Sequence, residues 1–401
     1  MAVGLDAPGR LLAVAGLRLA TTAAGLRRRG GDDLLLVELA EGSAVAAVFT
    51  RNRFCAAPVR LARSHLAAAV PRFLLINAGN ANAGTGRAGL EDARRCCAAV
   101  AERAGLALET VLPFSTGVIG ERLPVDRVLA ALPALFAGLT ADGWGAAARA
   151  IMTTDTVPKG LSLRVDLPGG AATVTGIAKG AGMICPNMAT MLAFIATDAR
   201  IEPRRLAALH RRLVAGSFNR ITVDGDTSTN DAALLIATGR GPAVPRRGPA
   251  AAAFEAALAE VYRHLAQAIV RDGEGATRFV AITVRGAAGP RQADAVARAV
   301  AHSPLVKTAL YAGDPNWGRI LAAVGRAGVA GVDAVSLAIN GVSILRGGEP
   351  DPGYSEAAGQ AALSAADIAI DIDLGAGSGE ATVWTCDLTE AYVRINADYR
   401  T

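Results

Sequence analysis

The densest group of residues that could carry chemistry lies between Lys179 and Met191. Lys179 precedes the glycine-rich stretch 180–182, and Thr190 stands where an apolar strand is expected to begin. Glycines let the backbone approach a ligand closely. A hydroxyl is a weak nucleophile without a base, but a chain break before Thr190 would create an α-amino group with a pKa of about 7.7–8.0. Thr190 could then supply both nucleophile and base. A threonine in a core strand remains the alternative.

A second candidate is the hydroxyl–glycine run Ser115 to Gly120, which contains Thr116 and Gly117. Its backbone N–H groups and hydroxyls could form an oxyanion hole. The same run is also typical of a structural Ser/Thr turn. The motif by itself leaves both interpretations open.

Two acidic loops could serve a ligand. The loop 223–231 resembles a calcium loop but fails as an EF-hand, because Thr229 replaces the required glycine and Leu235 the required glutamate. We therefore expect a hydrogen-bonded polar loop and no metal site. The loop 272–277 places Asp272 and Glu274 beside glycines, where they could bind a substrate ammonium or simply follow a helix C-cap.

Other signals exclude several classes of protein. Dinucleotide, P-loop, zinc-protease and nucleophile-elbow motifs are absent. Five cysteines without a CxxC pair argue against a disulfide scaffold or a zinc site. The four histidines are far apart and are interpreted as surface or core side chains. The C-terminal segment 392–401 is aromatic and alternating, and we expect it to be docked.

Composition predicts a folded protein without a nucleic-acid surface. Hydrophobic residues make up 52% of the 401 residues and charged residues 19%, which excludes disorder. The net charge of +5 comes almost entirely from arginine, since the chain has only three lysines. Its densest basic run, 27–29, has no interleaved aromatic residues. Charges at Asp6, Arg10 and Arg18 interrupt any signal peptide, so we expect a soluble cytoplasmic protein.

Strand-like and helix-like segments alternate along the chain, which predicts a mixed α/β fold of sheets packed with helices in two lobes. The predicted strands cover 44–49, 73–76, 161–166, 172–177, 191–196, 233–238, 279–284, 335–339, 368–372 and 381–385. The predicted helices cover 90–104, 125–135, 203–214 and 250–270. We expect an exposed loop at 240–249. Strand order is left open.

Taken together, the motifs resemble the ornithine acetyltransferase family, the ArgJ proteins of arginine biosynthesis. Each motif is modest alone, but their order along nearly the whole chain is specific. The resemblance rests on Asn77-Ala78-Gly79-Asn80-Ala81-Asn82, Ser115 to Gly120, Lys179 to Met183, Met188-Ala189-Thr190-Met191, the 223–231 loop, Asp272-Gly273-Glu274-Gly275, Asp314-Pro315-Asn316-Trp317-Gly318-Arg319, Ile395 to Tyr399 and Thr401.

The resemblance implies a two-lobed sandwich that cleaves itself between Ala189 and Thr190. The products would be an α chain, 1–189, and a β chain, 190–401, which stay associated and pair into an α2β2 heterotetramer. Thr190 would be the nucleophile, with Thr116 and Gly117 as the oxyanion hole. The resemblance also implies the following substrate-binding residues: Thr153, Lys179, Thr190, Glu274, Asn396 and Thr401. It implies no metal and no cofactor.

The implied reaction moves the acetyl group of N2-acetyl-L-ornithine to L-glutamate through an acyl-enzyme, in the cyclic route to L-arginine. Sequence does not decide whether acetyl-CoA is a second donor. Three rivals remain: a self-cleaving aminopeptidase that delivers the acyl group to water, a non-catalytic binding protein with the same fold, and, more remotely, a nucleic-acid-binding protein.

Overall fold

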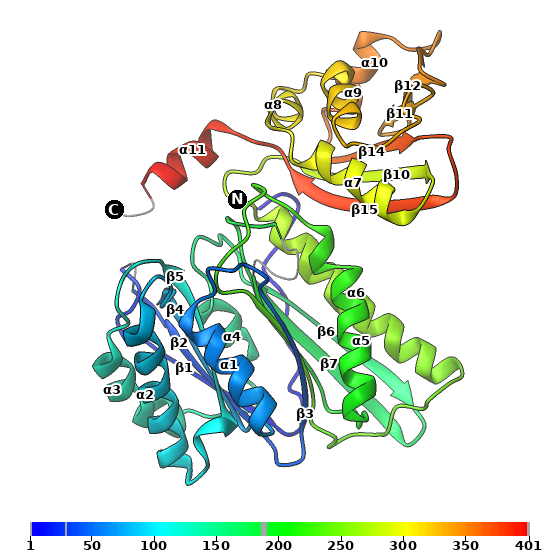
Figure 1. The fold of residues 1–401 in the computed structure, drawn as a ribbon. Coiled ribbons are helices and arrows are strands. Elements are labelled where there is room, and N and C mark those ends of the chain that lie inside the picture. The colour runs from blue at the N-terminus through cyan, green and yellow to red at the C-terminus, as the bar shows by residue number, and fades with distance from the viewer. Residues whose placement is uncertain (1, 29, 186–190, 399–401) are drawn as a thin grey trace. The chain divides into compact units, whose positions relative to one another are not determined.

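A computed structural model describes residues 2–28, 30–185 and 191–398 (Figure 1). The chain forms two compact units. The larger unit comprises Ala7–Asn219 and Thr227–Ile269, and the smaller comprises Met1–Asp6, Arg220–Asp226 and Val270–Thr401. These units are not the predicted cleavage products, 1–189 and 190–401, which stay a prediction.

Two sheets build the larger unit. Its strands are β1 Leu17–Thr22, β2 Leu34–Leu39, β3 Ala44–Phe49, β4 Phe73–Asn80, β5 Val111–Val118, β6 Lys159–Leu167, β7 Gly170–Lys179, β8 Leu192–Thr197 and β9 Ala232–Ala237. One sheet has the order β1-β2-β4-β5 and the other β3-β9-β8-β7-β6. The pairs β4–β5 and β8–β9 are parallel, so the ends of β4 and β5 lie together at one sheet edge.

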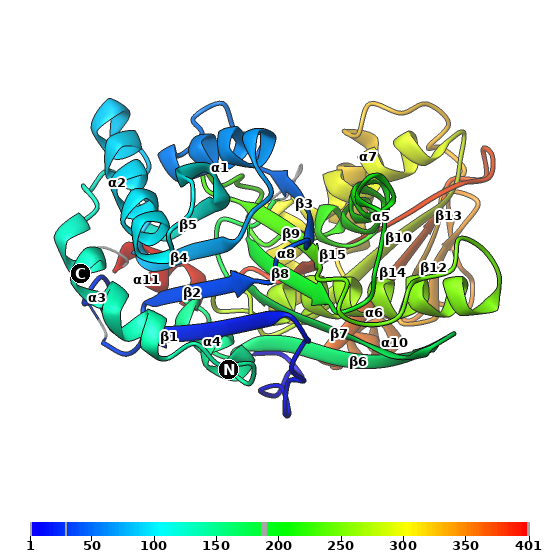
Figure 2. The same cartoon turned by 90° about the horizontal axis from the view of Figure 1, so that it is seen from below.

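Helices cover the outer faces of the two sheets (Figures 1 and 2). The helices of the larger unit are α1 Ala57–Ala68, α2 Gly86–Ala104, α3 Val125–Ala137, α4 Trp144–Ala150, α5 Pro203–Ala215 and α6 Pro249–Arg271, with 3-10 turns at η1 Leu108–Thr110 and η2 Phe218–Arg220. The α4 helix does not lie on an outer face, because its Trp144, Ala147 and Ala148 belong to the core between the two sheets. The α2 and α3 helices pack on the four-stranded sheet, and α5 and α6 lie on the five-stranded one. The unit is therefore a four-layer helix–sheet–sheet–helix sandwich.

Side-chain alternation along β2 explains this layering. Leu35 and Val37 enter the core between the sheets, while Leu34 and Leu36 pack toward α2 and α3. A strand buried on both faces is apolar at nearly every position, because neither face meets water. The sequence Leu-Leu-Leu-Val-Glu-Leu of β2 meets that requirement.

One six-stranded sheet builds the smaller unit, in the order β13-β12-β11-β14-β10-β15. The elements are β10 Phe279–Ala287, α7 Pro290–Ala301, α8 Pro304–Ala312, α9 Trp317–Gly325, β11 Ser336–Ile339, β12 Val342–Arg346, β13 Glu349–Pro350, α10 Glu356–Ala362, β14 Asp367–Asp373, β15 Gly379–Cys386 and α11 Glu390–Ala397. Residues of α7 and α9 cover one apolar face of the sheet. On the other face Arg285 pairs with Asp371 and Glu380.

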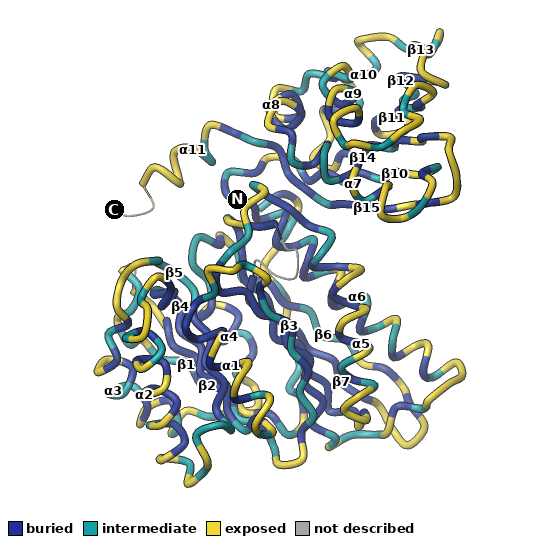
Figure 3. Tube along the Cα trace, viewed as in Figure 1, coloured by how far each residue is buried: buried dark blue, intermediate teal, exposed yellow. Residues whose placement is uncertain are grey.

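The predicted mixed α/β architecture is confirmed, and most predicted segments match an element within a few residues. The α3 helix runs through Pro133, as expected. Two differences matter for the site. Ser115 to Val118 belong to the end of β5 and do not form a turn. The described part of the C-terminal segment forms α11 and is not an alternating strand; residues 393–398 are exposed (Figure 3), while Tyr392 and Asn396 make the contacts described below. None of the helices in the described ranges is both long and apolar enough to cross a membrane.

Candidate active site

The ends of β4 and β5 approach each other through two glycines. Gly79 faces Gly117 in the parallel register of these strands. Gly117 has φ +130°, and a Cβ atom there would lie 2.3 Å from the carbonyl carbon of Gly79. Only glycine fits such an approach without moving the backbone. The sequence therefore fixes the position of the Thr116–Gly117 peptide at the edge of the sheet.

Lys179, the last residue of β7, joins two of the predicted site residues. Its Nζ donates to Thr153 Oγ1 at 2.7 Å and to Thr116 Oγ1 at 3.4 Å. An ammonium group only donates hydrogen bonds, so both hydroxyl oxygens accept here. The hydrogen of each hydroxyl is then left to donate elsewhere. Two oriented hydroxyl donors beside an ammonium group are suited to stabilise a negatively charged oxygen.

Asp155, in the loop before β6, anchors this arrangement. Its side chain is fully buried and accepts hydrogen bonds from Lys159 Nζ at 2.6 Å, from Gly180 N at 2.7 Å and from Thr153 N at 3.0 Å. Lys179 Nζ lies 3.8 Å from its Oδ2 atom. Burial opposes ionisation, but the charges of Lys159 and Lys179 hold the pKa of Asp155 well below its usual range. The carboxylate is therefore ionised at neutral pH.

The polar loop before β9 ties the sheet edge to neighbouring segments. The Nδ2 atom of Asn230 donates to the carbonyl oxygens of Ala81 and Ser115, at 2.5 and 3.0 Å. Thr227 Oγ1 donates to the carbonyl oxygen of Cys185 at 3.0 Å. The loop is thus hydrogen-bonded, as expected from its sequence. Within the described ranges, no group of three or more His, Cys, Asp or Glu side chains could hold a metal ion.

Asp231 closes this loop beside the start of β8. It is 2% exposed, and Ala232 N donates to the carbonyl oxygen of Met191 at 3.0 Å. Burial raises the pKa of Asp231 well above its usual value, although the Ser228 hydroxyl, the Lys179 charge and the Met191 N–H oppose this. Its Oδ2 atom has no hydrogen-bond partner among the residues that the structure describes. A carboxyl group that favours its protonated form therefore lies next to Met191.

The smaller unit holds a second cluster of predicted residues. Asn396 Nδ2, on α11, donates to Glu274 Oε2 at 2.8 Å. The Tyr392 hydroxyl donates to Asp224 Oδ2 at 3.3 Å. Gly275 permits this contact, because at φ +71° a Cβ atom there would lie 2.6 Å from the backbone nitrogen of Tyr392. Burial and the charges of Asp224 and Glu274 raise the pKa of Tyr392, so its phenol stays protonated and donates.

The structure thus groups the predicted residues in two clusters, each within one unit. Thr116, Thr153 and Lys179 form the first, with Gly117 beside Thr116 in the same strand. Glu274 and Asn396 form the second. The predictions for Ala189, Thr190 and Thr401 lie outside the described residues.

Sequence reasoning missed Asp155 and Lys159, and it treated Asp231 only as a member of the polar loop 223–231. The rarity of lysine could have indicated Lys159. Exposed basic positions of this chain are filled by arginine, and its three lysines, Lys159, Lys179 and Lys307, are all buried, at 1, 8 and 4% exposure. Buried lysines are uncommon without a charged or polar partner. Asp155 is a single carboxylate in a loop, and no residue spacing distinguishes it from a surface residue.

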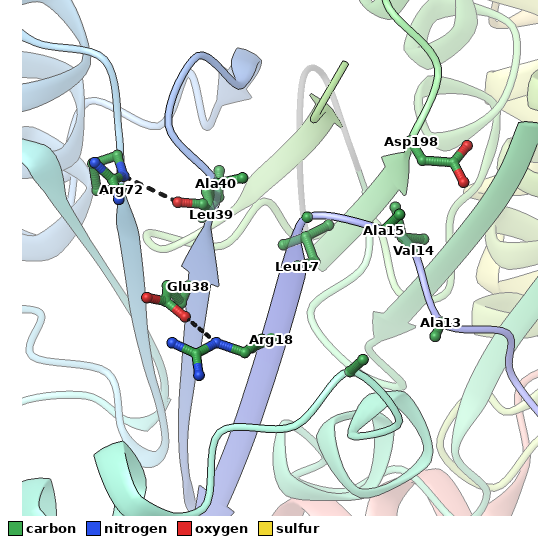
Figure 4. A pocket seen from close by; sticks show the side chains of 12 residues that line it. Ala13, Val14, Ala15, Leu17, Arg18, Glu38, Leu39, Ala40, Arg72 and Asp198 are labelled. Carbon is green, nitrogen blue, oxygen red and sulfur yellow. Dashed lines mark hydrogen bonds and ion pairs between the residues drawn. The ribbon is translucent and has the colours of Figure 1, made fainter. Parts of the chain in front are cut away.

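A separate hollow of about 540 Å³ lies in the larger unit, where the segment before β1 passes the end of β2 (Figure 4). Its charged side chains already have protein partners. Arg18 pairs with Glu38, Arg72 Nε donates to the carbonyl oxygen of Leu39, and Asp198 accepts from Thr173 N. Of the predicted site residues that the structure describes, none lines this hollow. It is therefore not the candidate site.

A family model and two relatives match the chain over almost its full length, and a solved structure matches about half of it. A family model described as "ArgJ family" matches residues 18–401. The "Arginine biosynthesis bifunctional protein ArgJ" of Methylococcus capsulatus is 57% identical over 397 residues, covering 98% of this chain and 97% of that protein. The protein of the same name from Pseudomonas syringae pv. tomato is 52% identical over 406 residues, covering 100% of both. A crystal structure of the protein of this name from Bacillus halodurans is 42% identical, with a TM-score of 0.50, and covers 52% of this chain and 100% of that chain.

Proposed function

The chain belongs to the ArgJ family, and from this premise we propose that it transfers the acetyl group of N2-acetyl-L-ornithine to L-glutamate in arginine biosynthesis. The observation that carries the proposal is the contact of Lys179 with both Thr116 and Thr153. This contact leaves two hydroxyl hydrogens to donate beside a positive charge. An acyl-transfer enzyme needs such an arrangement, because negative charge develops on the carbonyl oxygen in its transition states.

The proposed reaction has two half-reactions on Thr190. Its Oγ attacks the acetyl carbonyl of N-acetylornithine, its α-amino group takes the hydroxyl proton, and that proton passes to the departing amine of ornithine. The acetyl-enzyme then reacts with the amine of glutamate and regenerates the Thr190 hydroxyl. The Thr116 hydroxyl and the Gly117 peptide N–H would hold the oxyanion in both steps, and the Thr153 hydroxyl would donate to the same oxygen. Losing one such donor typically costs about 3 kcal/mol in the barrier.

The α-amino group must first be released by self-cleavage. In the proposed step, Thr190 Oγ attacks the carbonyl carbon of Ala189, the peptide becomes an ester on Oγ, and the hydroxyl proton moves to the freed amine. Water then hydrolyses the ester and leaves chains 1–189 and 190–401. The solved Bacillus halodurans chain matches 52% of this chain over its whole length. Residues 190–401 make up about the same fraction of the 401 residues, which supports the proposed cleavage. A Thr190→Ala variant is expected to stay one chain and to be inactive; a cleaved, active variant would refute the step.

We assign the two ends of the substrate to different side chains. Lys179 is suited to a carboxylate, and Glu274 with Asn396 to the side-chain ammonium of ornithine, because each offers the opposite charge or a complementary dipole. Thr153 and Thr401 complete the proposed binding residues. Replacing Glu274 should therefore discriminate between acetylated amino acids with and without a terminal ammonium.

The proposal needs no cofactor and includes acetyl-CoA as a second donor, since the related proteins are named bifunctional. The two chains are proposed to remain associated and to pair into an α2β2 assembly, which native mass spectrometry of the purified protein tests. An aminopeptidase would instead pass the acyl group to water.

Isotope exchange tests the proposed mechanism. Labelled ornithine is incubated with enzyme and unlabelled N-acetylornithine, without glutamate. An acetyl-enzyme predicts label in N-acetylornithine, because the first half-reaction is reversible by itself. Label that appears only when glutamate is added would contradict the two-step route, and release of acetate without exchange would favour the hydrolase.

A further inference from the structure

The Asp155–Lys159 pair is the most deeply buried ion pair of the larger unit among the residues that the structure describes. Both side chains are fully buried, and Lys159 Nζ lies 2.6 Å from Asp155 Oδ1. A buried ion pair contributes little net stability, because desolvation of both charges offsets their attraction. The burial of this ion pair therefore needs an explanation other than protein stability.

That reason lies in what else the carboxylate contacts. Asp155 accepts from the N–H of Thr153 and from the N–H of Gly180, the residue after Lys179. Its Oδ2 atom also faces the Lys179 ammonium at 3.8 Å. One carboxylate thus fixes the backbone on either side of the proposed acyl site: the loop that carries Thr153 and the end of the strand that carries Lys179.

The same contacts set the direction of the hydroxyl protons. Lys179 Nζ must lie near Thr153 Oγ1 and Thr116 Oγ1 for both oxygens to accept from it. If the ammonium moved away, each hydroxyl would be free to turn its hydrogen toward another acceptor. The position of Lys179 therefore decides whether the two hydroxyls point their donors at a developing oxyanion.

We propose that Asp155 is a positioning residue of the acyl-transfer site: it holds Lys179 and Thr153 so that the Thr116 and Thr153 hydroxyls donate to the reacting oxygen, while Lys159 balances its charge. This inference rests on the proposed function of the site and adds a residue that the family resemblance did not assign.

Three variants separate this role from a structural one. Asp155→Asn removes the anchoring charge but leaves the Lys159 ammonium buried, so the variant is expected to lose stability as well. The double variant Asp155→Asn/Lys159→Met removes both charges and should regain stability. Asp92→Asn is the matched control, because Asp92 is a buried carboxylate of α2 that accepts from Arg122 at 2.7 and 2.8 Å, in a cluster without any of the proposed site residues.

The rate of acetyl-enzyme formation from N-acetylornithine is the first readout. Asp155→Asn and the double variant should both lose about 10- to 100-fold, the scale of one or two hydrogen bonds to a charged group. Asp92→Asn should keep the wild-type rate. A double variant that is stable and fully active would overturn the proposal, as would equal losses in Asp155→Asn and Asp92→Asn.

The second readout does not depend on acyl chemistry, so it separates failure of this inference from failure of the proposed function. Protein labelled with 15N at the lysine side chains gives just three ammonium signals, since the chain has only three lysines. The proposal predicts a Lys179 signal that exchanges slowly with water in the wild type and in Asp92→Asn. Both Asp155 variants should broaden or lose it. An unchanged Lys179 signal in the double variant would show that Asp155 does not hold this side chain, whatever the reaction proves to be.

Discussion

Replacing Gly117 by alanine tests the close approach of β4 and β5 that the site depends on. A Cβ atom at this position would lie 2.3 Å from the carbonyl carbon of Gly79 and 2.7 Å from the nitrogen of Asn80. Real Cβ atoms do not approach backbone so closely, so the two strand ends must separate. The Gly117 peptide N–H, a proposed oxyanion donor, would move with them.

Gly120 provides the control. It also has positive φ, at +88°, but a Cβ atom there meets nothing within 4 Å. Gly120→Ala should therefore lose only the stability that backbone strain costs, about 1–3 kcal/mol of unfolding free energy. Gly117→Ala should lose more stability than this. It should also slow acetyl-enzyme formation about 10²–10³-fold, the effect of losing one oxyanion donor.

Urea unfolding measures the stability of both variants, and single-turnover acetylation with N-acetylornithine measures the rate. Gly120→Ala is expected to acetylate at close to the wild-type rate. If Gly117→Ala reacts as fast as Gly120→Ala, then the tight strand approach does not serve the reaction, and the role given to the Gly117 peptide is wrong.

Three other perturbations have defined outcomes. Glu274→Gln should lower kcat/KM for N-acetylornithine far more than for N-acetylalanine in steady-state assays; equal losses would remove Glu274 from ammonium binding. His210 is buried against the Tyr262 hydroxyl, and burial lowers its pKa to about 4. Between pH 6.5 and 4, His210 binds a proton in the unfolded chain but stays neutral in the folded protein. The free energy of unfolding should therefore fall by about 3 kcal/mol over this range. In urea unfolding at a series of pH values, His210→Gln should lack this dependence of stability on pH. If the variant keeps it, other groups are responsible for it. Burial raises the pKa of Asp231, so above about pH 4 the folded protein keeps a proton that the unfolded chain releases. In the uncleaved Thr190→Ala background, Asp231→Asn should therefore gain stability relative to aspartate as the pH rises from 4, and a constant difference would refute this.

The fold could be predicted well wherever side-chain periodicity reports burial. The strand near 368–372 and the helix from Pro203 follow their predicted bounds closely, because apolar spacing reflects one buried face. The run Leu34–Leu39 was not predicted as a strand. Because both faces of this strand are buried, apolar and polar residues do not alternate along it, and this alternation is the clearest sign of a strand.

The candidate site could be predicted only in part, for a physical reason. Thr116 and Lys179 lie in recognised motifs, and Thr153 was assigned only through the family resemblance. The structure joins the three by hydrogen bonds across 63 and 26 residues of sequence. Asp155 and Asp231 act through burial and charge, which depend on the folded chain around them. Their neighbours in sequence carry no sign of that environment, so only three-dimensional contacts could identify them.

The most direct test of the account is the intact mass of the purified protein under denaturing conditions, before and after brief incubation with N-acetylornithine. We predict two chains that divide between Ala189 and Thr190, and a gain of one acetyl group on the chain that begins at Thr190. The gain should disappear when glutamate is added. A single chain of 401 residues with no added mass, from a protein that is folded, would contradict the proposed nucleophile and favour a binding protein that keeps the fold without its chemistry.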